Sequence, residues 1–389
     1  MLILYEGLQA FNPTQPPEDP IGVYPPASAI IAAYLPNEAA TIEETIDAFL
    51  WVEYPGELQV ILAYNTPHDL PIEARLHELA QRDPRFVPLR VSKSTSKAQN
   101  VNTALSIASG QFVGIFDADH HPDQNSFLRA WQWLANGYDV VQGHCLVRNG
   151  SSSWVARYVA VEFEAIYAVS HPGRAKFHGF GIFGGSNGFW QTDLLWKTRM
   201  QSMMLTEDID SSIRVVAQGY RVASDPLLIS RELATTLAAF WKQRLHWSQG
   251  WFQVSLRHFW SSLTSPNLTL RQRMGAVHLL IWREVYPWLS FQMLPLICYF
   301  AWQAGGLDKL DWFIPLWVIT TLITQSTALA QTIFAYWCGD PSIRQHRDWY
   351  SWFLVVGFFF FTPLKNVIAM LAQIKEAMRE SVWHITPRG

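Results

Sequence analysis

The sequence is poor in charge and in cysteine. Only 16% of its 389 residues are Asp, Glu, Lys or Arg, against roughly 25% in an ordinary soluble domain. The formal net charge of -3 provides no basic field, so we expect no nucleic acid partner. The three cysteines, Cys145, Cys298 and Cys338, lie far apart. Their number and spacing exclude a disulfide framework and a cysteine metal motif, and fit a reducing compartment or simple use in the core.

A secretory signal is also missing from the first residues. Met1–Tyr24 has no basic start followed by a long apolar run. Six prolines between positions 13 and 26 instead predict an extended lead-in over residues 1–27, without a helix. The sequence contains no internal repeat and no low-complexity tract.

Aromatic side chains, by contrast, are abundant: 14% of the residues, with 19 Trp and 23 Phe. Low charge combined with many aromatic residues is typical of a protein partly in lipid. Three apolar stretches, residues 276–301, 312–335 and 350–374, follow Trp260. Since a bilayer core of ~30 Å needs about 20 apolar residues per helix, we expect a C-terminal membrane region at residues 263–389, with about three apolar helices and a short basic tail. The alternative is that the stretches are buried core helices of a soluble protein.

The three stretches differ from one another. The first contains Arg283 and Glu284, so it also fits an interfacial amphipathic helix leading into a span. The third is expected to break near Pro363 into two half-segments. Basic residues place both the loop with Arg344 and Arg347 and the C-terminal tail on the cytoplasmic side, which a single crossing by the third stretch does not allow. The number of crossings stays open.

Residues 28–262 alternate between strand and helix patterns. Predicted strands cover residues 28–35, 58–63, 86–91 and 112–116, and predicted helices cover 42–50, 71–82 and 97–109. A capping box is expected from Thr41 to Glu44. The alternation predicts an α/β fold with a parallel sheet and helices on both faces. Ligands of such sheets bind at the carboxyl ends of strands, where Asn37, Asn65 and Asp117 lie.

Asp117-Ala118-Asp119 leaves the last of these strands and enters a loop. Two carboxylates at this position suit Mg²⁺ or Mn²⁺ held against a diphosphate, because hard cations prefer oxygen ligands. The alternative is a strand-end turn with capping Asp residues. His120 and His121 follow directly; neighbouring side chains point apart on an extended backbone, so we favour solvated loop histidines over a zinc site.

Two further polar motifs come next. Gly184-Gly185-Ser186-Asn187-Gly188 is rich enough in glycine for close backbone approach to a ligand, or is an ordinary turn. The aromatic residues before it, from Phe177 to Phe183, form either a sugar-stacking wall or a hydrophobic loop. Thr206-Glu207-Asp208 precedes a helical pattern. Its acids are either helix caps or a base that deprotonates an acceptor hydroxyl.

The last motif lies just ahead of the apolar stretches. Gln243, His246, Trp247 and Gly250 recur at three-to-four spacing and share one face of a helix. Trp247 offers a stacking surface for a sugar, and Arg244 is suited to bidentate phosphate binding. The alternative is an amphipathic surface helix docked to the membrane.

In this order, the motifs resemble those of the membrane-bound, inverting family 2 glycosyltransferases, which include cellulose, hyaluronan and poly-N-acetylglucosamine synthases and bacterial glycolipid glucosyltransferases. The resemblance covers about residues 28–260 and the apolar stretches, and it includes Asn37-Glu38 and the segment Lys97–Asn102. It implies a GT-A, Rossmann-like nucleotide-sugar-binding catalytic domain at residues 28–262 with an interfacial helix, then a helical transmembrane region. It also implies a UDP-sugar donor, Mg²⁺ or Mn²⁺, and an integral cytoplasmic-membrane protein whose catalytic domain faces the cytoplasm.

The same resemblance implies roles for individual residues. Asp208 would be the catalytic base with Glu207 beside it, Asp117 would bind the nucleotide and share the metal, and Asp119 would bind the metal. The remaining residues divide between the donor (Asn37, Glu38 and Lys97) and the acceptor or diphosphate (Gly185, Ser186, Asn187, Gln243, Arg244, His246 and Trp247).

Three features depart from the family pattern. His246 stands where the last motif has Arg, Tyr64-Asn65 stands where many members carry acids for the uracil, and no apolar helices precede the catalytic domain. We therefore expect transfer of a hexose, with glucose favoured, to either a lipid or a growing polysaccharide, with a homo-oligomer or channel partner as one way to complete a polymer channel. The alternatives are a non-catalytic or degenerate nucleotide-sugar-binding subunit and, less well matched, a soluble nucleotidyltransferase.

Overall fold

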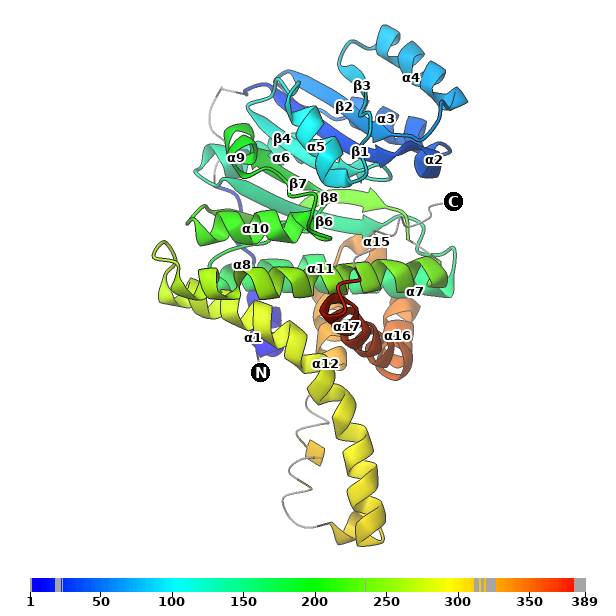
Figure 1. Ribbon diagram of the computed structural model, residues 1–389, viewed down its shortest axis with the longest axis vertical. Helices are drawn as coiled ribbons and strands as arrows, with labels where there is room; N and C mark the ends of the chain where they lie inside the picture. Colours follow the sequence, from blue (N-terminus) through cyan, green and yellow to red (C-terminus); the bar gives the residue numbers. More distant parts are fainter. Residues whose placement is uncertain are drawn as a thin grey trace.

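The computed structural model describes residues 2–17, 22, 24–234, 236–310, 315, 318–319 and 327–380. A mixed sheet fills one half of the molecule and a layer of helices underlies it (Figure 1). The strands are β1 (Ala27–Tyr34), β2 (Leu58–Asn65), β3 (Phe86–Arg90), β4 (Phe112–Asp117), β5 (His121–Pro122), β6 (Val140–Val147), β7 (Gly188–Gln191) and β8 (Val222–Glu232).

Helices surround this sheet and continue beyond it. The α-helices are α1 (Leu2–Ala10), α2 (Leu35–Glu38), α3 (Ile42–Leu50), α4 (Pro71–Arg82), α5 (Lys97–Leu105), α6 (Ser126–Ala135), α7 (Trp154–Phe163), α8 (His171–His178), α9 (Thr192–Thr198), α10 (Glu207–Ala217), α11 (Leu237–Thr264), α12 (Leu270–Ala304), α14 (Thr327–Cys338), α15 (Pro341–Arg344), α16 (Arg347–Val356) and α17 (Thr362–Ala377). The π-helical segments are η1 (Glu164–Ser170) and η3 (Gly357–Phe361), and η2 (Leu307–Lys309) is a 3₁₀ turn.

The expected parallel sheet is only partly correct. Strands β3, β2, β1 and β4 pair in parallel, as their alternation with helices predicts. Strand β7 then inserts between β4 and β6 and runs antiparallel to both, and β5 is antiparallel to β8. The sheet is therefore mixed. The short β7 follows the glycine-rich loop directly, so this antiparallel insertion carries the loop to the end of β4.

The core has two layers, one on each face of the sheet. On one face Ile30 and Val113 pack with Val101 of α5 and Ile213 of α10. On the other face the β1 and β4 side chains pack with Ile46 of α3 and with α6. Alternate residues of the parallel strands thus face opposite helical layers, and both faces are buried, as in other α/β sheets.

Three local predictions need correction. Residues 2–10 form helix α1, so the lead-in is not extended throughout; the prolines that break helices begin only after it, at Pro13. The capping box from Thr41 to Glu44 is also absent: the Thr41 hydroxyl donates instead to the Glu38 carbonyl, 3.4 Å away. Helix 97–109 ends early, at Leu105.

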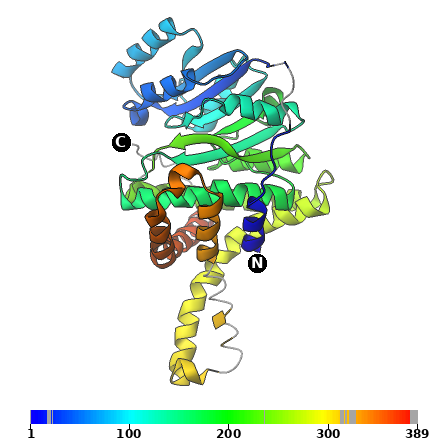
Figure 2. The same ribbon diagram turned by 180° about the vertical axis from the view of Figure 1, so that it is seen from behind.

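The C-terminal helices pack against the catalytic half. Helices α14, α16 and α17 share a core cluster with α7 and η1, and α17 also contacts α11 and α12. Helix α12 starts beside α11, and its C-terminal part extends away from the rest (yellow in Figures 1 and 2). The expected domain boundary after residue 262 falls in the last turn of α11. Half of the expected span 312–335 lies outside the described residues, and residues 327–335 belong to α14.

The third apolar stretch is continuous. Instead of breaking at Pro363, the helix runs from Arg347 to Ala377 through the π-helical segment η3, after which Pro363 occupies the first turn of α17, where its missing N–H is tolerated. Among the described residues this helix alone is long and apolar enough to cross a bilayer, and 24% of its most apolar window is buried. Core helices of soluble proteins can have the same length and composition.

Candidate active site

Lys97 brings three of the predicted motifs together. It is the first residue of α5, whose N-cap Ser96 accepts a hydrogen bond from the Gln99 N–H. Its Nζ donates to Asp117 Oδ1 at 2.5 Å and to the Gly185 carbonyl at 2.6 Å. Burial disfavours the ammonium, but Asp117, Glu207 and Asp208 outweigh this effect and raise the pKa of Lys97. We call Lys97, Asp117, Glu207 and Asp208 the Lys97 cluster.

Glu207 and Asp208 lie in the first turn of α10. Burial raises the pKa of Glu207, and the charge of Asp208 raises it further. Burial also raises the pKa of Asp208, while Lys97 and backbone N–H groups oppose the shift. A carboxylate with a pKa moved towards neutrality is matched to general-base work.

The glycine-rich loop touches Asp208 closely. Gly185 has φ of +100°, and a Cβ there would lie 2.6 Å from Asp208 Oδ2, so only glycine fits. The loop is tied to the acidic pair because the Asp117 N–H donates to Ser186 Oγ at 3.0 Å. Asn187 points inwards instead: its Nδ2 donates to the His144 and Leu228 carbonyls.

Gln142, which the sequence analysis did not single out, holds this loop in place. From inside β6 it donates to the Ser186 carbonyl at 2.9 Å and accepts from the Gly184 N–H at 2.7 Å. A polar residue inside an otherwise apolar run, Val140 to Val147, was the available signal, since a buried amide needs partners.

The second acid of the Asp117-Ala118-Asp119 motif lies in the interior of the protein. Asp119 is fully buried, and its Oδ2 accepts from the Leu233 N–H at 3.1 Å. His120 beside it is also fully buried, so the expectation of a solvated histidine is wrong. Its Nδ1 lies 3.0 Å from Ser230 Oγ and its Nε2 lies 2.8 Å from Glu232, because β5 pairs with β8 at this point. His121 is half-buried.

The expected donor residues lie after β1. Asn37 and Glu38 are in the short helix α2, where Asn37 Nδ2 donates to Glu38 Oε1 at 3.0 Å. Asn65 at the end of β2 accepts from Asn100 of α5 and donates to the Ser94 carbonyl. Tyr64 is buried and bonded to Glu73, so it lies in the core.

The Gln243–Trp247 motif lies on α11, which packs against the Thr206-Glu207-Asp208 turn. A Cβ at Gly250 would lie 2.5 Å from Thr206 Cγ2, so the two segments are in direct contact. Gly250 shares a helix face with Gln243, His246 and Trp247, which are half-buried.

Arg244 is engaged within the protein. Its guanidinium donates to Glu162 of α7 at 2.5 Å and lies 4.3 Å from the centroid of the Trp247 ring. Lys365 of α17 donates to the other Glu162 oxygen at 2.8 Å. Burial opposes ionisation of Glu162, but the two cations prevail and lower its pKa. This network joins α7, α11 and α17.

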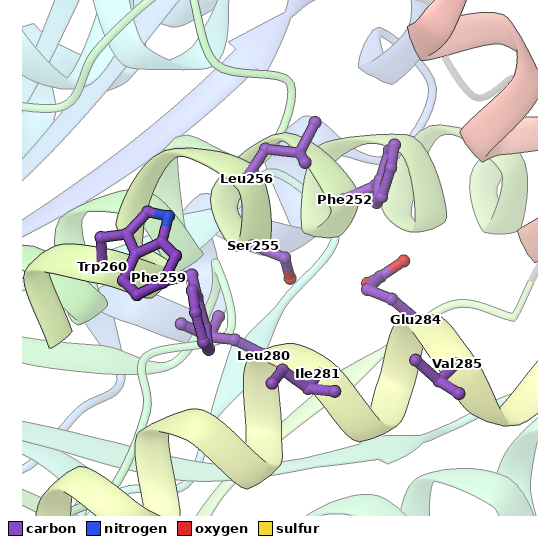
Figure 3. A pocket seen from close by; sticks show the side chains of 9 residues that line it. All are labelled: Phe252, Ser255, Leu256, Phe259, Trp260, Leu280, Ile281, Glu284 and Val285. Atoms are coloured by element: carbon purple, nitrogen blue, oxygen red, sulfur yellow. The ribbon is translucent and has the colours of Figure 1, made fainter. Parts of the chain in front are cut away.

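Two other features bear on the sequence predictions and on possible ligands. Phe180 and Phe183 are buried, which fits the hydrophobic-loop reading and not an open sugar-stacking wall. An apolar groove runs between α11 and α12, lined by aromatic and aliphatic side chains with Ser255 and Glu284 as its polar members (Figure 3).

Comparisons with known proteins place this geometry in a family. Residues 112–361 match the family described as Glycosyl transferase family group 2. Curated relatives include the poly-beta-1,6-N-acetyl-D-glucosamine synthases of Staphylococcus epidermidis, 27% identical over 257 residues, and of Staphylococcus aureus strain COL, 26% identical over 255 residues. Each alignment covers 62% of this chain and 58% of the relative, so the chain spans under two thirds of their length.

Among solved structures, the mannosyltransferase PcManGT from Pyrobaculum calidifontis, in complex with GDP-Man and Mn²⁺, superposes with a TM-score of 0.62. The two chains are 18% identical, and the match covers 98% of this chain and 95% of the other. This likeness concerns the fold, which is an α/β fold of the GT-A type. The family match covers well over half of the residues, and the chain therefore belongs to the family 2 glycosyltransferases.

Proposed function

We propose that this chain transfers a sugar from a nucleotide-diphosphate donor to a hydroxyl of a growing polysaccharide, with inversion at the anomeric carbon. The observation that carries the proposal is the Lys97 cluster. It gathers one cation, the carboxylate of Asp117 at the carboxyl end of β4, and two carboxylates of raised pKa. Lys97 also links the cluster to the glycine-rich loop through the Gly185 carbonyl. Ligands of α/β sheets bind at the carboxyl ends of the strands.

Asp208 is the proposed base. The acceptor oxygen attacks the anomeric carbon, the bond from that carbon to the diphosphate oxygen breaks, and the hydroxyl proton passes to Asp208. Burial raises the pKa of Asp208, and the charge of Lys97 opposes that rise. Gly185 has no side chain, which leaves room beside the Asp208 carboxylate. Glu207 shares the turn, and burial together with the charge of Asp208 raises its pKa as well.

Asp117 and Asp119 are the proposed holders of Mg²⁺ or Mn²⁺. Their carboxylates are hard oxygen donors on one turn, and Asp119 is oriented by the Leu233 N–H, so the donor set fits such an ion. When bound, the ion would offset the charge of the leaving diphosphate. Lys97, already beside Asp117, adds a second positive charge, and Asn37 and Glu38 are the proposed contacts to the donor.

Helix α11 is the proposed boundary on the acceptor side. Gln243, His246 and Trp247 share the face that contacts Thr206 through Gly250. Because Arg244 is held by Glu162, its proposed role is to fix the position of Trp247 rather than to bind phosphate itself.

The identities of the donor sugar and of the acceptor are further proposals. The curated relatives are named for a polymer of N-acetylglucosamine, which favours UDP-N-acetylglucosamine and a glycan acceptor; the sequence-based preference for glucose has no separate support in the site. A lipid acceptor is the second candidate, favoured by the apolar groove between α11 and α12. Exposed apolar side chains on α12 support a place at the cytoplasmic membrane surface.

The test is UDP release by detergent-purified protein with Mn²⁺ or Mg²⁺. UDP-N-acetylglucosamine, UDP-glucose, UDP-galactose and GDP-mannose are supplied in turn, with and without diacylglycerol, and products are sized by mass spectrometry. A ladder from one donor supports polymer synthesis, and a single glycolipid identifies a lipid acceptor instead. Folded protein that binds UDP but releases none from any donor would overturn the proposal in favour of a non-catalytic nucleotide-binding subunit.

A further inference from the structure

Outside the active site, three helices bring a carboxylate and two imidazoles together. Glu6 lies on α1, His178 is the last residue of α8, and His278 lies in the third turn of α12. Helices α1 and α12 both pack against α8 on the side of the molecule away from the sheet (Figure 2). One ligand-type atom from each residue lies within 4.8 Å of the other two.

The atoms that face one another have no hydrogen bond. Glu6 is 2% exposed and His178 is 5% exposed, yet neither Glu6 Oε1 nor His178 Nε2 has a hydrogen-bond partner among the described residues. The two atoms are 3.8 Å apart, too far for a hydrogen bond. Buried polar atoms without hydrogen-bond partners are uncommon and cost free energy, so these two atoms point to a bound ligand between them.

A neighbouring arginine orients the Glu6 carboxylate. Glu6 Oε2 accepts from Arg174 Nε at 3.2 Å, which orients the carboxylate and turns its other oxygen towards His178. Ligating carboxylates are commonly held by a second group in this way.

Glycines permit the close approach of the three helices. A Cβ at Gly275 of α12 would lie 2.5 Å from His178 Cγ, and a Cβ at Gly173 of α8 would lie 2.2 Å from the Glu6 carbonyl. In a tetrahedral zinc site with bonds of ~2.0 Å, ligand atoms lie roughly 3.3 Å apart, so the three ligand atoms would approach one another by about 1.5 Å or less on binding.

We propose that Glu6, His178 and His278 bind a divalent transition metal of the zinc class. Two imidazoles and one carboxylate form a common zinc donor set, and water would complete the coordination. The ion would fasten α1 and α12 to α8. This site is separate from Asp117 and Asp119, whose oxygen-only donors suit harder cations.

The experiment measures zinc in tag-free, full-length protein that is stripped with chelator, equilibrated with Zn²⁺ and dialysed. We expect one tightly held zinc in the wild type, and an affinity more than about tenfold lower in His178→Gln, His278→Gln and Glu6→Gln, since even loss of a supporting residue costs that much. His77→Gln, an exposed histidine on α4, is the matched control and should retain the ion.

A second cluster, His120, Cys145 and Glu232, provides the competing explanation. Zinc lost in Cys145→Ala but kept in His178→Gln would overturn the proposal, as would sulfur in the zinc X-ray absorption spectrum of the wild type. The spectrum decides the matter even where a variant fails to fold, because nitrogen and oxygen ligands alone are expected. Wild-type protein that retains no zinc would also overturn it.

Discussion

At the scale of single residues, Lys97 and Asp208 depend on each other. Lys97 is the cation that offsets Asp117, Glu207 and Asp208 in a half-buried setting, where interactions between charges are stronger than in water. Asp208 in turn is a carboxylate whose ionisation is made harder by burial and easier by Lys97. The ionisation of Asp208 therefore depends on Lys97, and each residue yields a prediction.

Lys97→Met should lower turnover by about 10²-fold or more and shift its pH dependence. The base must be ionised, so activity falls as pH drops through the raised pKa of Asp208; without Lys97 that pKa rises further and the acidic limb moves to higher pH. The measurement is kcat/KM against pH, with Lys197→Met, an exposed lysine on α9, as the control. An unmoved acidic limb would separate Lys97 from the base.

Asp208→Asn should abolish transfer while leaving the fold as stable or more stable, by about 0.5–2 kcal/mol. The sign follows because the folded-state pKa values of Glu207 and Asp208 are raised, so their ionised forms weaken the folded state near pH 7 and removing one charge relieves it. Thermal unfolding and UDP release are measured together, with Asp193→Asn as the exposed control. Activity near the wild-type level would show that another group is the base.

At the scale of elements, α11 is one of the helices that connect the sheet with the C-terminal helices. Its Gly250 contacts the turn before α10, its Arg244 meets Glu162 of α7, and Glu162 also holds Lys365 of α17. The lower pKa of Glu162 reflects these two cations, which keep it ionised although it is buried. These contacts join α17 to the helix that carries the Gln243–Trp247 motif.

Gly250→Ala should weaken both stability and activity. Alanine favours helices over glycine by ~1 kcal/mol, but the new Cβ would lie 2.5 Å from Thr206 Cγ2 and 2.8 Å from the Thr206 backbone N. Overpacking of this kind costs about 1–3 kcal/mol and pushes α11 away from Asp208. Thermal unfolding and kcat are compared with Gly357→Ala, whose Cβ meets Tyr158 at an ordinary 3.5 Å and should be neutral. Unchanged kcat in Gly250→Ala would show that this contact does not position the base.

At the scale of the whole molecule, the sheet and the C-terminal helices lie on opposite sides of the α7–α11 layer (Figure 1). The protruding helix α12 exposes large apolar side chains: Ile281, Trp282, Val285, Trp288, Leu289, Tyr299 and Trp302. Large apolar side chains exposed along one helix suit an interaction site, and tryptophan is favoured at the membrane interface.

Val285→Glu combined with Leu289→Glu should weaken binding to anionic liposomes by roughly tenfold or more, because burying an exposed aliphatic side chain contributes ~1.5–3 kcal/mol. Val285 is 42% exposed and Leu289 is 51% exposed in the wild type. Cosedimentation with liposomes is the measurement, and Leu227→Glu, 55% exposed on β8, is the matched control that should bind as the wild type does. Equal loss in both proteins would point to a general charge effect rather than to α12.

The sequence by itself determined the local structure and the order of the motifs. Hydrophobic periodicity depends on neighbours a few residues apart, and for this reason β1, α3, β2 and α4 follow the predicted ranges closely. The family resemblance drawn from the ordered motifs is likewise confirmed by the match over residues 112–361. The roles assigned to Asp119, Asp208 and the other site residues remain predictions.

Only the tertiary structure decided how distant segments meet. The antiparallel insertion of β7, the burial of His120 and the pairing of Arg244 with Glu162 all join residues dozens of positions apart. Such contacts depend on which faces of separate elements pack together, and no local period encodes that choice. The same reason applies to Glu6, His178 and His278: three residues scattered along the sequence form one cluster because α1 and α12 both pack against α8.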